Sequence, residues 1–150
     1  MAQTWKFTAL EHRCETHPHE ACGETYVDKN GDTALHWAVF GNPPVSAIEA
    51  LVHASPQSAQ LYNQNGDLPL HIACSYRANI GVLRSLLHIY PDAIGMSNGK
   101  GMSPIHILCD VGCPPEVIEC VLQEMKRTGS LHLVCTTDNR MGLTPFLILN

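Results

Sequence analysis

One nine-residue segment recurs along the chain and constrains the fold more than any other feature. It occurs three times at steps of 35 residues, as NGDTALHWA at 30–38, NGDLPLHIA at 65–73 and KGMSPIHIL at 100–108. A second element keeps this spacing, as IEALV at 48–52, LRSLL at 83–87 and IECVL at 118–122. A fourth copy begins as MGLTPFL at 141–147, after six additional residues. Two elements that share one period are typical of a repeat protein.

Each copy predicts a pair of helices. Residues suited to begin the first helix follow each turn glycine, namely Thr33, Pro69, Ser103, Pro104, Thr144 and Pro145. In the second element apolar residues recur at the spacing of an amphipathic helix, as at Ile48, Leu51 and Val52. One pair cannot bury its apolar face alone, so the copies must stack. The sequence therefore predicts an all-α solenoid of stacked antiparallel helix pairs joined by turn or hairpin loops.

The motif around each turn resembles that of a known family. Gly-x-Thr-x-Leu-His-x-Ala at 31–38, with its counterparts at 66–73 and 101–106, resembles the turn and helix start of the ankyrin repeat. Leu68 stands where the capping hydroxyl is usual, and Ala34 where proline is usual. The resemblance implies an ankyrin solenoid with a concave protein-binding face. It also implies that the motif histidines, His36, His71 and His106, bond to the neighbouring turn.

The period suggests how the chain is divided. We expect a leading partial repeat over 1–27, repeats over 28–62, 63–97 and 98–137, the last with a lengthened loop, and a truncated fourth repeat over 138–150. The fourth copy has no second helix to pair with its first. We therefore expect weak self-association through this uncapped C-terminal end.

The charge and hydropathy of the chain restrict its partners and location. The formal charge of −5 and the nine scattered lysines and arginines provide no basic surface for nucleic acid. No apolar run approaches the roughly 18 residues of a membrane span, and the start lacks the pattern of a signal peptide. Seven cysteines, an odd number, do not indicate a disulfide framework. We expect an intracellular protein, cytoplasmic or nuclear, that binds neither nucleic acid nor membrane.

One segment offers an alternative chemistry. Cys14, His17, His19 and Cys22 place four zinc-type ligands within nine residues. Structural zinc sites usually combine a tight Cys-x2-Cys pair with a second pair or a histidine pair at a set spacing, and this segment has no tight cysteine pair. Alignment with the later copies instead makes residues 5–14 a second helix, with Cys14 in its core. We favour a helix end, with no metal and no cofactor, and keep a metal-binding or thiol-regulated module as the alternative.

The remaining cysteines and the motif histidines do not indicate an enzyme. Cys109 and Cys120 occupy repeat positions taken by other small residues, whereas Cys113 is expected to be exposed and more reactive. No acid or nucleophile accompanies the histidines at a fixed offset, so we expect no catalytic residue. A second alternative is that the chain is a regulatory fragment of a larger enzyme.

The resemblance implies where a partner would bind. On the ankyrin pattern, residues beside each turn glycine and near the end of each first helix point into the concave face. Here they are Lys29, Asn30, Asp32, Phe40, Gln64, Asn65, Asp67, Ser75, Tyr76, Lys100, Met102, Asp110 and Val111. Trp37, which aligns with Ile72 and Ile107, is instead expected in the stacking core. The expected function is non-catalytic protein binding, with a partner that the sequence does not identify.

Overall fold

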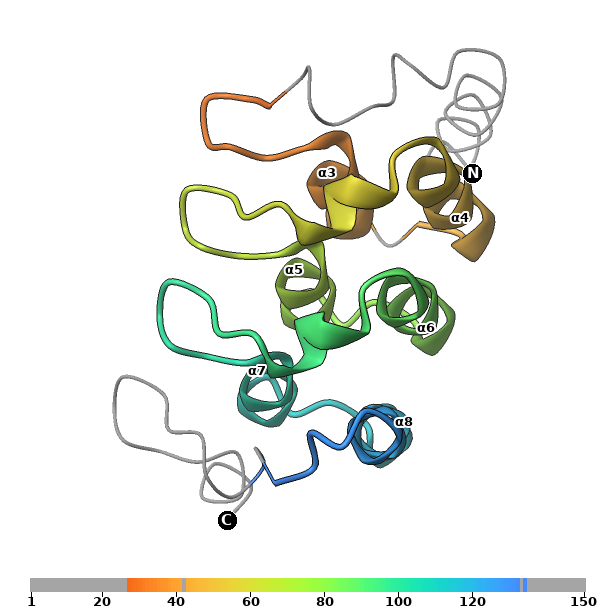
Figure 1. Ribbon diagram of the computed structural model, residues 1–150, viewed down its shortest axis with the longest axis vertical. Helices are drawn as coiled ribbons and strands as arrows, with labels where there is room; N and C mark the ends of the chain where they lie inside the picture. The colour runs from red at the N-terminus through yellow and green to blue at the C-terminus, as the bar shows by residue number, and fades with distance from the viewer. Residues whose placement is uncertain (1–26, 42, 133, 135–150) are drawn as a thin grey trace.

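The computed structural model describes residues 27–41, 43–132 and 134. All regular secondary structure in this part of the chain is helical (Figure 1). The short inner helices are α3 (Ala34–Phe40), α5 (Pro69–Ser75) and α7 (Pro104–Asp110). The longer outer helices are α4 (Val45–Ala54), α6 (Ile80–Ile89) and α8 (Pro115–Arg127). The inner helices lie in one layer and the outer helices in a second, with hairpin loops projecting beyond the inner layer. The predicted all-α solenoid of helix pairs is confirmed.

The helices begin where capping chemistry predicts. The Thr33 side chain accepts a hydrogen bond from the backbone N–H of His36, while prolines occupy the first positions of α5 and α7. The Asn79 side chain caps α6 in the same way, accepting from Val82 N at 3.0 Å. Between α5 and α6 the chain turns through Arg77, whose φ is 53°, and Gly112 takes a similar left-handed conformation one repeat later.

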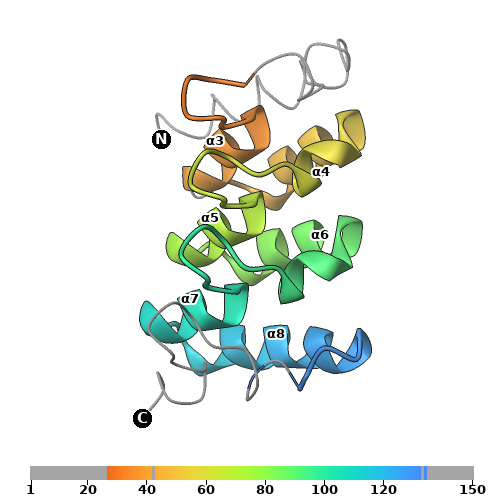
Figure 2. The same ribbon diagram turned by 60° about the vertical axis from the view of Figure 1, so that its left-hand side comes forward.

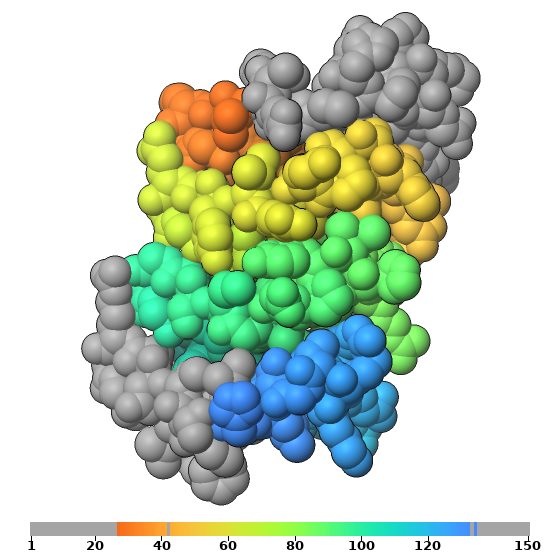
Figure 3. Space-filling model, in the orientation of Figure 1, coloured from red at the N-terminus to blue at the C-terminus, as the bar shows by residue number. Residues whose placement is uncertain are grey.

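The core lies between the two helix layers and continues from repeat to repeat. Each inner helix packs on the next inner helix, and each outer helix on the next outer helix. Leu35, Leu70 and Ile105 are equivalent residues of α3, α5 and α7, and all three are almost fully buried. The space-filling view shows the repeats as successive bands of one stack (Figure 3). Burial of apolar surface between neighbouring pairs is therefore the main stabilising contribution.

Short 3-10 turns return the chain from each outer helix to the next hairpin. They are η1 (Pro56–Gln60) and η2 (Pro91–Gly95), each beginning with proline. The hairpins then approach one another closely. A Cβ atom on Gly99 would lie 2.2 Å from the carbonyl oxygen of Asn65, so only glycine fits there.

One expectation about the cysteines is wrong. Cys113 is 8% exposed, because the loop before α8 turns inward and the Cys113 N–H bonds to the carbonyl of Leu108. Burial raises the pKa of its thiol, with a partial opposing effect from Arg77, so Cys113 is not the reactive cysteine we expected. Cys109 is buried, as its repeat position predicted.

Some expectations lie outside the described residues. They are the leading helix over 5–14, the segment with Cys14, His17, His19 and Cys22, and the fourth copy with Thr144 and Pro145.

Candidate functional site: the concave groove

A groove of about 350 Å³ lies between the hairpins and the inner helices of the first two described repeats. We call it the concave groove. Its hairpin wall consists of Asn30, Asp32, Asn63, Asn65 and Asp67, and its helix wall of His36, Trp37, Phe40, Ile72, Ser75 and Tyr76. Figure 2 turns the hairpins toward the viewer and shows them stacked in front of α3, α5 and α7.

A ladder of side-chain hydrogen bonds fixes the hairpin wall. The Asn63 Oδ1 atom accepts from the backbone N–H groups of Asn65 and Asp67, at 3.0 and 2.9 Å, which holds the hairpin closed. The Asn63 Nδ2 group then donates to Asp32 Oδ1 of the preceding hairpin at 2.8 Å. One repeat later, Asn98 Nδ2 donates to Asp67 Oδ1 at 2.7 Å. The two carboxylates of the groove are thus held in place by the next hairpin.

Backbone hydrogen bonds join the same hairpins. Gln64 N donates to the carbonyl of Asn30 at 2.9 Å, and Gly99 N donates to that of Asn65 at 3.0 Å. The groove is therefore part of a rigid stack and not a wall of independent loops.

The motif histidines fix the inner helices to the hairpins. His36 Nδ1 accepts from the backbone N–H of Thr33 at 3.2 Å, and its Nε2–H donates to the carbonyl of Asp67 at 3.0 Å. His71 makes the equivalent bonds, from Leu68 N at 3.0 Å and to Met96 O at 3.0 Å. Both nitrogens are used only if the ring is neutral with its proton on Nε2. The bond to the neighbouring turn that the resemblance implied is confirmed for these two residues.

Burial is the main cause of the lowered pKa of both histidines. The hydrogen bond to the Asp67 carbonyl and the neighbouring aspartates oppose this effect for His36, and the bond to Met96 opposes it for His71. These rings are thus neutral near pH 7, the form in which Nδ1 accepts and Nε2–H donates in the bonds that connect the repeats.

Three aromatic side chains form a cluster on the helix wall. The rings of Phe40 and Tyr76 have centroids 4.1 Å apart, and those of Trp37 and Phe40 are 6.2 Å apart. Trp37, Phe40 and Tyr76 are 55%, 50% and 51% exposed, so each presents a large apolar surface to solvent. We call these three residues the aromatic cluster.

The placement of Trp37 in the core was therefore wrong. At the same repeat position, Ile72 is partly buried and Ile107 is buried. Alignment with these two residues therefore suggested a core position for Trp37. The larger indole extends beyond the packed layer instead. Its Nε1–H donates to Asp28 Oδ2 in the adjacent hairpin at 3.3 Å, which keeps the ring at the surface. The signal that could have found it is the size of tryptophan beside the isoleucines of the other copies.

Only some of the residues expected on the concave face line the groove. Lys29 and Gln64 are exposed on the hairpins outside the groove lining, and Gln64 Nε2 donates to the carbonyl of Lys29. Lys100 and Asp110 are exposed on the third repeat. Met102 and Val111 are partly buried against the core. The groove itself therefore contains Asn30, Asp32, Phe40, Asn65, Asp67, Ser75 and Tyr76 from that set.

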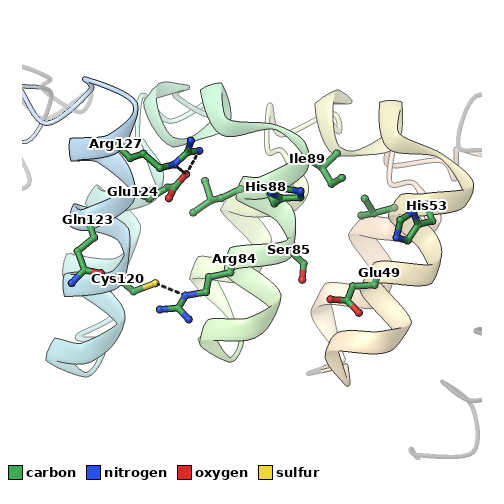
Figure 4. Close-up of a pocket in the computed structure, with 12 residues that line it drawn as sticks. Glu49, His53, Arg84, Ser85, His88, Ile89, Cys120, Gln123, Glu124 and Arg127 are labelled. Carbon is green, nitrogen blue, oxygen red and sulfur yellow. Dashed lines mark hydrogen bonds and ion pairs between the residues drawn. The ribbon is translucent and has the colours of Figure 1, made fainter.

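A second hollow, of about 750 Å³, lies on the opposite side across α4, α6 and α8 (Figure 4). It was not predicted from the sequence, although His53 and His88 recur there at the 35-residue spacing. Of its charged side chains, Arg127 forms an ion pair with Glu124, and Arg84 Nε donates to Cys120 Sγ at 3.4 Å. We call this surface the convex groove.

The described residues offer no metal site, and two of their buried thiols are not activated. Within them, no group of three or more His, Cys, Asp or Glu side chains could hold a metal ion. Burial raises the pKa of Cys109 to about 11 and also raises that of Cys74. These thiols are protonated at neutral pH and are poor nucleophiles. No helix of the described part of the chain is long and apolar enough to cross a membrane.

Comparison with known proteins agrees with the helix-pair architecture. A family model for ankyrin repeats, in three copies, matches residues 10–94, which is more than half of the chain. No curated protein matches the sequence. Helices α7 and α8 continue the same pattern beyond the matched region. The chain therefore belongs to the ankyrin repeat family.

Proposed function

We propose that the chain binds a protein partner in the concave groove and carries out no catalysis. Ankyrin repeats generally mediate protein–protein interaction, and the family is typically non-enzymatic. The observation that carries the assignment to this groove is the aromatic cluster. Six large hydrophobic residues are exposed in the described part of the chain, and three of them adjoin one another here.

The physical setting of the cluster favours binding. Clustered exposed aromatic residues are typical of interface hot spots, because they bury much apolar area when a partner excludes water. Phe40 ends α3 and Tyr76 immediately follows α5, so both stand on packed helices. The hydrogen-bond ladder fixes the facing wall. A partner would therefore bind a preorganised surface and would lose little affinity to ordering it.

The experiment is to replace both central rings, Phe40→Ala with Tyr76→Ala, and to measure binding of a partner captured by the intact chain. We expect binding to weaken by about 2 kcal/mol or more, roughly 30-fold in Kd. The melting temperature should change little, because both side chains are half exposed. The matched control is His53→Ala with His88→Ala, two exposed residues of the convex groove.

Comparison of the two variants tests whether the partner binds the concave groove or the convex groove. Unchanged binding by the aromatic variant, or an equal loss in the histidine control, would contradict the proposal. Extensive unfolding of the aromatic variant would also contradict it, since it would assign these rings to the core.

A further inference from the structure

The lining of the concave groove combines two chemistries that suit one kind of ligand. The aromatic rings of Trp37, Phe40 and Tyr76 line the helix wall. The carboxylates of Asp32 and Asp67 stand on the hairpin wall of the same cavity. A cation gains favourable energy from both, through the π electrons of a ring and through charge-assisted hydrogen bonds to a carboxylate.

The lining residues themselves supply no compensating positive charge. Among them there is no lysine or arginine, and the one histidine, His36, has a lowered pKa because it is buried. Outside the lining, Lys29 is exposed on the first hairpin, and the guanidinium of Arg77 bonds to the Val111 carbonyl of the third repeat. The lining of the groove therefore contains two carboxylates and no lysine or arginine.

The two carboxylates retain capacity for a ligand. Asp32 and Asp67 are each only partly buried, and an ionised carboxylate has about four acceptor positions. The ladder uses Oδ1 of each, with Asn63 or Asn98 as the donor. These bonds also hold the carboxylates in position before a ligand arrives.

From these observations we infer that the concave groove binds an arginine side chain of an extended partner segment, between the aromatic cluster and the carboxylates of Asp32 and Asp67. This inference rests on the proposed function and names the chemistry of the partner. Arginine fits better than lysine, because its planar guanidinium can stack on a ring while its edge donates to a carboxylate. A purely aliphatic anchor would leave both carboxylates without a counter-charge. The volume of about 350 Å³ is at the small end for ligand pockets, which suits one side chain.

The test begins with a random heptapeptide library displayed on phage. Peptides are selected on the intact chain after depletion on the Phe40→Ala, Tyr76→Ala variant, so that those kept depend on the groove. We expect one position of the selected peptides to be strongly enriched in arginine. Enrichment of acidic or purely apolar residues, or of lysine over arginine, would overturn the inference.

Synthetic peptides then test the contact itself. Replacing the enriched arginine by citrulline keeps the planar shape and removes the charge, and should weaken binding by about tenfold or more. The variant Asp67→Asn keeps an oxygen that can accept from Asn98 and should weaken the arginine peptide to a similar extent. It should leave the citrulline peptide unchanged. Equal affinity of the two peptides for the intact chain would overturn the inference, as would equal losses of both in Asp67→Asn.

The outcome is separable from that of the proposed function. If the captured partner depends on Phe40 and Tyr76 but no groove-dependent peptide prefers arginine, the proposed function holds and the arginine site is wrong. If the partner does not depend on these rings, the proposed function itself fails.

Discussion

His71→Leu tests how the repeats are joined. The His71 ring is fully buried and bonds at both nitrogens, to Leu68 N within its own helix start and to Met96 O in the segment that leads to the next hairpin. Leucine can fill much of the same space but can neither accept nor donate. The substitution therefore leaves the buried N–H of Leu68 and the partly buried carbonyl of Met96 without their partner.

The expected magnitude follows from those two groups. An unsatisfied buried backbone group costs about 1–3 kcal/mol of unfolding free energy, so the Leu68 N–H should lose about that much, with a smaller addition from the partly buried Met96 carbonyl. Urea unfolding followed by circular dichroism measures this loss. His88→Leu is the matched control, since it is the same substitution at an exposed position of α6. We expect the control to change stability by about 0.5 kcal/mol or less.

The reasoning would be refuted by a loss below about 1 kcal/mol in His71→Leu, or by equal losses in the two variants. Either result would mean that the paired ring nitrogens do not contribute to the stability of the stack.

Three other predictions concern the core, pH and metal. Leu70→Ala, at a position 2% exposed, should lose about 2–4 kcal/mol and broaden the unfolding transition, and a melt like that of the wild type would contradict the packing. Acid should destabilise the fold, because burial lowers the pKa of His36 and His71 from 6.5 and the unfolded chain then binds protons more readily. Stability should be complete above about pH 6.5 and fall as the pH drops below it, and a urea midpoint unchanged between pH 7 and 5 would contradict this. A strong chelator should leave helicity and melting temperature unchanged, whereas a stoichiometric zinc ion whose removal unfolds the chain would favour the metal alternative at 14–22.

The helix pairs could be predicted because their signals are local. A turn glycine, a capping hydroxyl or proline and an apolar face each act within a few residues, and they recur every 35. Gly31, Gly66 and Gly101 have φ values of 72–76°, which is the conformation that the turn requires. The bonds of His36 and His71 came from the family resemblance rather than from local chemistry.

The predictions for Trp37 and Cys113 were wrong because the burial of each side chain depends on contacts that alignment of the repeats does not show. Trp37 shares its repeat position with isoleucines, but its length and its bond to Asp28 bring it to the surface. Cys113 was expected to be exposed near the start of a helix. Its equivalent one repeat earlier, Ala78, is 3% exposed, so an apolar residue at this repeat position indicates that the loop turns inward.

The ladder between hairpins could not be derived from one copy. It joins Asp32 to Asn63 and Asp67 to Asn98, which are 31 residues apart in sequence. The aspartates were expected on the concave face, but their fixed orientation depends on the close approach of consecutive hairpins.

The central claim is that a partner contacts the concave groove, and mapping by amide hydrogen exchange tests it most directly. Exchange of the free chain would be compared with that of its complex with the captured partner. Our account predicts slower exchange in the hairpins around Asn30 and Asn65 and at the ends of α3 and α5, with little change in α4, α6 and α8. Protection confined to those outer helices, which form the convex groove, would contradict it.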